Sequence, residues 1–156
     1  MRSSALSRRL FLAQAALVLA VSCRADGLHV LVTEAEAEAS RAAPPPPLTR
    51  GFVPPGAPRI EFVSPTADGA NRAPLTFELR FAPQADARID PASLRVQYGC
   101  LRVDITDRLR AYGRVDETGA VASNLAIPRG DHRVRVLITD SRGSFDEAEY
   151  NRQLGR

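Results

Sequence analysis

The sequence predicts an all-β fold, an antiparallel β-sandwich of about seven strands over residues 59–156. The clearest observation is the stretch 132–139, in which His, Val, Val and Ile alternate strictly with Arg, Arg, Leu and Thr. A period of two indicates a half-buried strand, because successive side chains point to opposite faces. Similar short segments recur across residues 59–156 with turn residues between them, and no segment there is long enough for a helical class.

We expect the strands, in chain order, at residues 60–63, 75–81, 93–98, 101–105, 120–127, 132–139 and 145–154. The alternation over 75–81 is the cleanest and places four large apolar side chains on one face. Ile89 lies in the connection before the third strand, where it can fill the core. A helical turn is expected at 106–109, with Thr106 or Asp107 as its cap. The last strand is heavily charged, which suits a protected sheet edge.

The composition excludes several classes of chemistry. All 21 basic residues are arginine, so a Walker-type phosphate loop and a Schiff-base lysine are both absent. Three arginines lie in the first 23 residues, which contain no acid, and the other 18 balance the 18 Asp and Glu residues. The formal net charge of +3 is therefore no argument for a nucleic-acid partner, and we expect none.

Residues 1–23 are typical of an export signal peptide. A positive start precedes a twelve-residue apolar run, which is too short to span a membrane. Arg8 and Arg9, followed by Leu-Phe-Leu, resemble the twin-arginine export motif, although Ala13 stands where a basic residue is usual. An ordinary secretory leader that carries two arginines is the alternative.

Cys23 ends this leader and is a candidate lipidation site. The preceding Ala-Val-Ser resembles a lipoprotein box, although Leu is more usual than Ala20 at its first position. Cleavage by a general signal peptidase after Ala20 or after Ala25 is the alternative. The expected location is the periplasm of a bacterium, or its membrane as an anchored lipoprotein.

Residues 24–58 predict a flexible linker rich in Ala, Glu and Pro. Residues 28–32 can form one short strand, and Thr33 with Glu36 forms a capping-box start to a short helix. Seven of the twelve prolines lie between residues 44 and 58, a density that favours extended polyproline geometry. We interpret the segment as a tether, and a proline-rich ligand for a partner's aromatic groove is the alternative.

Three turn motifs connect this region to a known family. Asp-Pro-x-Ser at 90–93 leads into a strand, Pro-x-Gly-x-His at 128–132 opens the penultimate strand, and Asp-x-x-Gly at 140–143 follows it. Residues 59–156 thereby resemble the bacterial Ig-like domains of secreted and surface proteins. The chain lacks the inter-sheet cysteine pair and the core Trp of antibody domains, so the resemblance is one of architecture. It implies a spacer, an adhesion module or a binding accessory to envelope enzymes.

We therefore expect a non-catalytic binding or structural module of the cell envelope, with no catalytic, cofactor-binding or metal-binding residues. The alternative is a small periplasmic hydrolase or a metal-dependent enzyme, against which two His and no Cys-x-x-Cys motif argue. An acid pair of Asp104 and Asp107, and a calcium site between Asp140 and Asp146, are the carboxylate hypotheses to test.

Cys100 is the only cysteine besides Cys23. In an oxidising compartment it is open to an intermolecular disulfide, or it packs in a turn as a small hydrophobic residue. A nucleophilic pair with His132 requires neighbouring strands and a third orienting group, which the sequence does not identify.

Four arginines form the candidate binding face: Arg95, Arg102, Arg133 and Arg135. We expect their strands to share one sheet, so that a basic stripe faces an envelope protein or an anionic glycan. The alternative is a solvated face neutralised by acids such as Asp104 and Glu149. Contact with a membrane is expected only through the signal or a lipid anchor.

Overall fold

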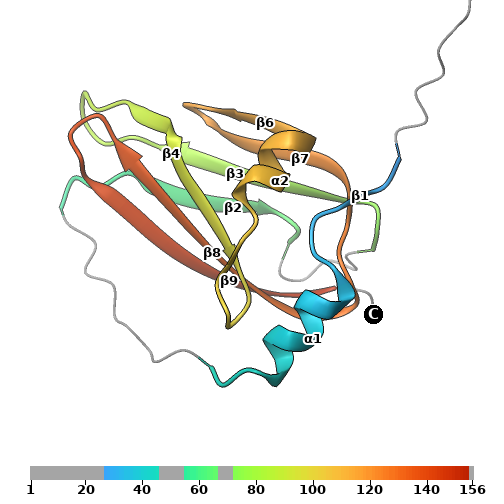
Figure 1. The fold of residues 1–156 in the computed structure, drawn as a ribbon. Coiled ribbons are helices and arrows are strands. Elements are labelled where there is room, and N and C mark those ends of the chain that lie inside the picture. The colour runs from blue at the N-terminus through green and yellow to red at the C-terminus, as the bar shows by residue number, and fades with distance from the viewer. Residues whose placement is uncertain (1–26, 46–54, 67–71, 155–156) are drawn as a thin grey trace, which may run out of the picture.

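The computed structural model describes residues 27–45, 55–66 and 72–154. This part of the chain is mostly β and forms two sheets that face each other around one apolar core (Figure 1). The leader, with Arg8, Arg9 and Cys23, lies outside the described residues. Among the described residues, no helix has the length and apolar character needed to cross a membrane.

The first sheet has the order β1-β7-β3-β2, and β6 pairs with the same strand, β7, as β1 does. Its strands are β1 (His29–Val30), β2 (Arg59–Ser64), β3 (Leu75–Ala82), β6 (Gly113–Asp116) and β7 (Gly119–Ala126). The β1–β7 pair is parallel and the other pairs are antiparallel. The sequence gives little signal for β6, because its four residues include a single apolar side chain, that of Val115.

The second sheet has the order β5-β4-β8-β9 and is antiparallel throughout. Its strands are β4 (Ile89–Tyr98), β5 (Val103–Asp104), β8 (Gly130–Asp140) and β9 (Phe145–Leu154). The predicted alternation is confirmed in β8, where every second residue from His132 to Asp140 is buried. It is also confirmed in β3, which buries its four large apolar side chains. Ile89 is buried, as expected, although it belongs to β4.

A short helix, α2 (Thr106–Tyr112), covers the core between the two sheets and buries Leu109. The expected cap is wrong, since the residue at the cap position is Ile105, whose side chain makes no capping hydrogen bond. Thr106 instead accepts a hydrogen bond from the Val96 backbone N–H at 2.8 Å, so it connects the helix to β4.

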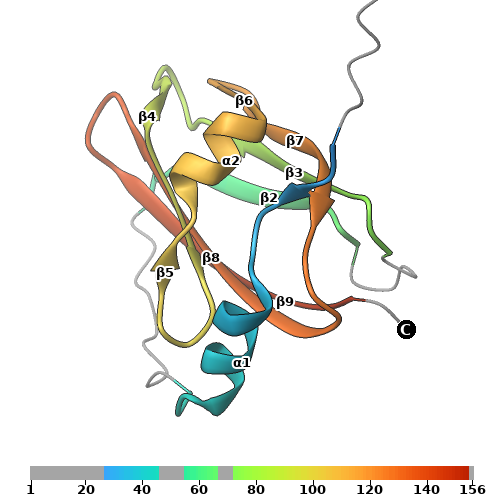
Figure 2. The same cartoon turned by 45° about the vertical axis from the view of Figure 1, so that its right-hand side comes forward.

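The N-terminal part of the expected linker belongs to the fold. We call residues 28–43 the N-terminal strap, which consists of β1 and helix α1 (Glu34–Ala42) and crosses one side of the molecule (Figure 2). The predicted capping box is confirmed, with Glu36 N–H donating to Thr33 Oγ1 at 3.2 Å and Thr33 N–H donating to Glu36 Oε2 at 2.9 Å. A flexible linker is therefore not observed over these residues.

Burial and one ion pair explain why the strap docks. Leu31, Val32 and Ala37 are at most 2% exposed and join the core of the two sheets. Arg108 of α2 donates two hydrogen bonds to the Glu36 carboxylate, at 2.7 and 2.8 Å, and a third to the Leu31 carbonyl at 3.1 Å. The capping glutamate thus also fixes the strap to the sandwich-like body.

The position of the strap changes the interpretation of the proline-rich stretch. The start of this stretch, residues 44–45, follows α1. Its last part, residues 55–58, directly precedes β2. Both α1 and β2 belong to the same packed body (Figure 1). The stretch therefore connects two parts of one fold, and the expected tether between the leader and the fold is not observed.

Candidate functional site

The arginine face lies on the outward side of the β5-β4-β8-β9 sheet. Arg95 is on β4, and Arg133 and Arg135 are on β8 between buried residues, so these three share one face as predicted. Arg102 is not on a strand. It lies in the turn before β5 with a φ of 53°.

Each strand-borne arginine has an acidic neighbour. Arg95 pairs with Asp104 at 3.3 Å, and Arg133 pairs with Glu149 at 3.1 Å. Arg135 pairs with Glu147 and is the least exposed, with 18% of its side chain accessible. The basic stripe is therefore a ladder of ion pairs across neighbouring strands, which is the alternative that the sequence left open.

Asp104, one of the acids on this face, is held in its charged form. Hydrogen bonds from Thr106 are the main cause that lowers the pKa of Asp104, and Arg95 contributes further. Ion pairs on an exposed surface contribute only about 0 to 1 kcal/mol each. Replacing the carboxylate of an exposed pair, such as that of Arg95 and Asp104, therefore costs little, whereas the Arg135–Glu147 pair is better shielded from water.

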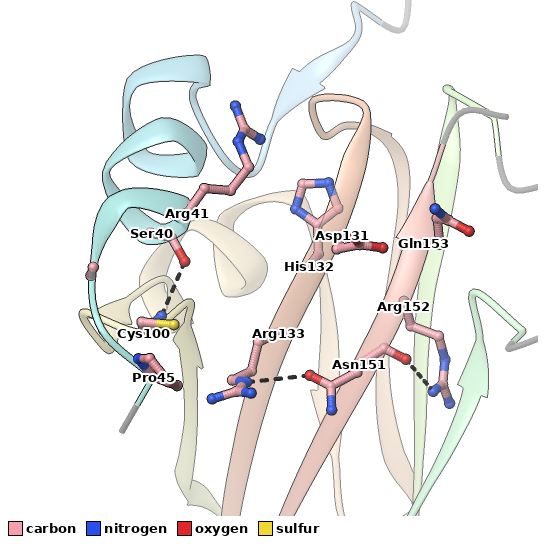
Figure 3. Close-up of a pocket in the computed structure, with 11 residues that line it drawn as sticks. Ser40, Arg41, Pro45, Cys100, Asp131, His132, Arg133, Asn151, Arg152 and Gln153 are labelled. Carbon is pink, nitrogen blue, oxygen red and sulfur yellow. Dashed lines mark hydrogen bonds between the residues drawn. The ribbon is translucent and has the colours of Figure 1, made fainter. Parts of the chain in front are cut away.

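A pocket of about 510 Å³ lies beside this face, between the end of α1, the β4–β5 turn and the β8–β9 pair (Figure 3). Polar lining comes from Ser40, Arg41, Cys100, Asp131, Arg133 and Asn151. Ser40 Oγ accepts a hydrogen bond from the Cys100 N–H at 3.0 Å, and Arg133 Nε donates to Asn151 Oδ1 at 3.3 Å. Arg133 therefore belongs to both the ladder and the pocket.

Gly99 permits this arrangement. Its φ is +71°, and a Cβ atom at this position would lie 2.3 Å from Ser40 Oγ. A glycine here thus allows α1 to approach the β4–β5 turn closely. The Gly99 N–H donates to the Arg133 carbonyl at 2.8 Å, which fixes the turn beside β8.

His132 lines the same pocket but is engaged through both ring nitrogens. Nε2–H donates to the Pro128 carbonyl at 2.8 Å, so Nδ1 accepts from the Tyr98 hydroxyl at 2.6 Å. The residue is 4% exposed, and burial is the main cause that lowers its pKa below the ordinary value. His132 is thus not available as a base for Cys100, whose thiol is free and half-buried.

The carboxylate hypotheses meet structural partners instead of a shared site. Asp140 Oδ1 accepts the N–H groups of Arg142 and Ser144 at 2.9 Å each, which closes the β8–β9 hairpin. Asp146 Oδ2 accepts the Ile60 N–H at 3.0 Å. Asp104 serves Thr106 and Arg95, as described above. Within the described ranges, no group of three or more His, Cys, Asp or Glu side chains is placed to hold a metal ion.

Comparison with known proteins gives no family assignment. The chain matches no protein-family model, and no curated protein matches its sequence. The arguments for its function therefore come from its own residues and geometry.

The pocket was missed at the level of sequence because α1 forms one of its walls. A signal was present, since the apolar stretch 28–32 directly precedes the capping box of Thr33 and Glu36. An apolar stretch that leads into a capped helix is typical of a docked segment. The Glu-Ala alternation of α1 concealed this, because it carries only one buried residue, Ala37.

Proposed function

We propose that this chain is a non-catalytic Ig-like binding module, exported to the bacterial cell envelope. The observation that carries the proposal is the position of Arg133, which joins the arginine ladder to the pocket beside it. The chemistry it suits is an anion presented by an envelope protein or a glycan, because a guanidinium group binds carboxylate and phosphate with two hydrogen bonds.

The turn motifs support the Ig-like part of the proposal. In the Asp-Pro-x-Ser motif, Asp90 Oδ1 accepts the Ala92 N–H at 3.0 Å and Ser93 Oγ donates to the Asp90 carbonyl at 2.7 Å. Ser93 Oγ also accepts the Thr139 N–H at 2.9 Å, so the motif connects β4 to β8. The motif lies inside β4, where the pairing with β8 is irregular between Asp90 and Arg95, and its hydrogen bonds stabilise this part of the strand.

The leader supports the location. Arg8 and Arg9 resemble a twin-arginine export motif, and Cys23 ends the apolar run as in a lipoprotein box. Export through the twin-arginine route accepts folded cargo, and a lipidated Cys23 would hold the module at a membrane.

Binding at this site exchanges one ion pair for another. A carboxylate or phosphate of the ligand takes the place of Glu149 on Arg133, while Asn151 keeps its hydrogen bond to the same guanidinium. The pocket gives room for the atoms that follow the anionic group, with Ser40 and Asp131 as polar contacts. Because the exchanged pair is partly solvated, we expect binding that weakens as salt rises.

Capture from detergent-solubilised native envelope tests the proposal. The bait is residues 24–156, since a bait that begins at residue 59 lacks the strap. The test variant is Arg133→Gln with Arg135→Gln. The matched control is Arg80→Gln with Arg114→Gln, which removes the same charge from two ion-paired arginines of the other sheet.

We expect the wild type and the control to capture the same partner, with capture lost in the test variant and reduced by salt. Equal capture by both variants would place the partner elsewhere on the module. A bait that captures nothing above background would leave a passive spacer, and the proposal of a binding site would be abandoned.

A further inference from the structure

The docked strap fixes the distance between the leader and the fold. Only residues 24–27 separate Cys23 from Leu28, so a fully extended chain reaches at most roughly 17 Å between them. The strand that follows is held in place, because β1 pairs with β7 and the Leu31 N–H donates to the Ala126 carbonyl at 3.0 Å. A lipid on Cys23 therefore keeps β1 close to the bilayer surface.

Two apolar side chains are exposed at β1, that of Val30 within the strand and that of Leu28 just before it. His29 points inward, where its ring stacks on Tyr112 with centroids 4.5 Å apart. Leu28 and Val30 lie on the opposite side of the strand and are 55% and 49% exposed. In the parallel pairing His29 is opposite the buried Leu125, so Leu28 and Val30 share the outward face of this sheet.

Val121 adds to the same face from β7. It is 38% exposed and lies between the buried Ala120 and Ala122, and an irregularity of β7 near Asn124 (φ 57°) shifts the alternation before Leu125. We call Leu28 and Val30 the β1 apolar patch. Val121 lies further along the same face, on the part of β7 that pairs with β6, whereas β1 pairs with Leu125 and Ala126.

The charges beside Val121 on this face of the sheet are balanced. Val121 lies between Arg114 of β6 and Glu78 of β3 in the sheet register. Arg114 pairs with Asp116 at 3.1 Å, and Glu78 pairs with Arg80 at 3.3 Å. A neutral apolar surface matches the boundary between headgroups and acyl chains, and it has no excess of positive charge to attract anionic lipid.

We propose that the β1 apolar patch rests on the bilayer surface to which Cys23 is anchored, a contact beyond the anchor itself. This inference depends on the lipid-anchored form of the proposed function. We infer the bilayer as the contact of this patch because a lipid on Cys23 would hold the bilayer surface close to Leu28. The arginine face belongs to the other sheet, so it remains available to a partner while β1 is at the membrane.

Tryptophan fluorescence tests the proposal directly, because the chain contains no Trp. The test variant is Leu28→Trp and the matched control is Leu101→Trp, which replaces a leucine of 56% exposure just before β5. Figure 2 shows β5 on a different side of the fold from β1. The full chain, purified from membranes in detergent, is reconstituted into phosphatidylcholine vesicles with brominated acyl chains.

We expect the Leu28→Trp emission to shift to the blue and to be quenched about twofold, with the Leu101→Trp emission unchanged. The quenching should be the same when anionic lipid is added, because the patch is apolar and its surroundings are neutral. A urea unfolding curve of each variant verifies that the exposed substitution leaves the fold intact.

Three outcomes overturn the proposal, and they are distinguishable. A chain that fails to float with the vesicles lacks the anchor, which removes the anchored form of the proposed function together with this inference. A chain that floats without quenching of the Leu28→Trp emission is anchored but does not lie on β1, and the proposed function is unaffected. Quenching that requires anionic lipid would replace the apolar contact by an electrostatic one.

Discussion

At the scale of single residues, the pair of Glu36 and Arg108 is a bidentate charged contact between the strap and helix α2. The hydrogen bonds from Arg108 are the largest cause that lowers the pKa of Glu36 to about 2 from an ordinary value of 4.5. A carboxyl whose pKa is lowered on folding stabilises the protein above its unfolded pKa, and the stabilisation is lost as the pH falls towards the folded pKa. The relevant window is therefore pH 4.5 down to about 2.

We predict that Glu36→Gln lowers the free energy of unfolding at pH 7 by about 1 to 2 kcal/mol, less than the full pKa shift implies because the pair is partly solvated. Urea unfolding at pH 7 and pH 3 measures this. The wild type should lose stability between the two values, and the difference should shrink in the variant. Glu38→Gln, on the same helix and outside this pair, is the control. An unchanged pH dependence in Glu36→Gln would contradict the assignment.

Tyr98 and His132 form a second contact at this scale. Burial raises the pKa of Tyr98 to about 12 and lowers that of His132, so both groups are neutral in the fold. A buried neutral histidine stabilises the protein above its unfolded pKa of about 6.5, and this stabilisation declines as the pH falls below that value.

We predict that Tyr98→Phe costs about 1 to 3 kcal/mol in free energy of unfolding, because Nδ1 of His132 loses its donor in a buried place. Chemical denaturation at pH 8 measures the loss. Tyr112→Phe is the matched control, since Tyr112 contacts His29 through its ring, which phenylalanine keeps. A cost no larger than that of the control would show that the Tyr98–His132 hydrogen bond does not matter for stability.

At the scale of elements, side chains of β9 close the edge of β2. The Ile60 N–H donates to Asp146 Oδ2 at 3.0 Å, and the Tyr150 hydroxyl donates to the Ile60 carbonyl at 2.9 Å. The two sheets thus meet where each has an edge strand, and the free backbone groups of Ile60 are satisfied by side chains. This explains the polar sequence of β9, which was expected at a protected edge.

We predict that Asp146→Ala speeds hydrogen exchange of the Ile60 amide at least about tenfold and lowers the free energy of unfolding by about 1 to 2 kcal/mol. Amide exchange measured by NMR gives both quantities at residue resolution. Glu61→Ala, an acid-to-alanine change next to Ile60 on β2, is the control. Equal exchange rates for Ile60 in the wild type and in Asp146→Ala would exclude the closed edge.

The strands were predictable from the sequence wherever one face is buried. The alternation of apolar and polar residues fixes the pairing register of β8 and β3, because a slip by one residue would expose their apolar side chains. The sequence did not reveal β6, whose four residues pair only with β7. It also placed the cap of α2 on Thr106 or Asp107, whereas Thr106 bonds to β4, a contact that local sequence does not encode.

The arginine face was predictable in part. Strand periodicity was enough to place Arg95, Arg133 and Arg135 outward on one sheet. The ion-pair partners of Arg133 and Arg135 depend on the alignment of β8 with β9, which is set by the whole hairpin, and the partner of Arg95 depends on the pairing of β4 with β5. The pocket depends on contacts between residues that are still further apart in the sequence. Helix α1 contacts the β4–β5 turn, and the Cys100 N–H donates to Ser40 Oγ across 60 residues of chain.

At the scale of the whole molecule, the strap determines where the folded unit begins. Leu31 and Val32 are packed in the core between the sheets, and burying side chains of this size contributes about 1.5 to 3 kcal/mol each. The sum, about 3 to 6 kcal/mol, is a large part of the total stability of an ordinary domain, about 5 to 15 kcal/mol. A chain without the strap is therefore expected to lose much of its free energy of unfolding.

We predict that a chain beginning at residue 46 loses at least about 4 kcal/mol of stability and that a peptide of residues 27–45, added in trans, restores it. Near-ultraviolet circular dichroism and urea unfolding measure the loss and its rescue, which should rise with peptide concentration. The control peptide carries Glu36→Gln and should bind more weakly, because Arg108 then lacks its charged partner. A truncated chain as stable as the complete one would show that the strap lies on the surface without supporting the core. The proline-rich stretch could then act as a tether after all, because the leader would be joined to the sheets only through it.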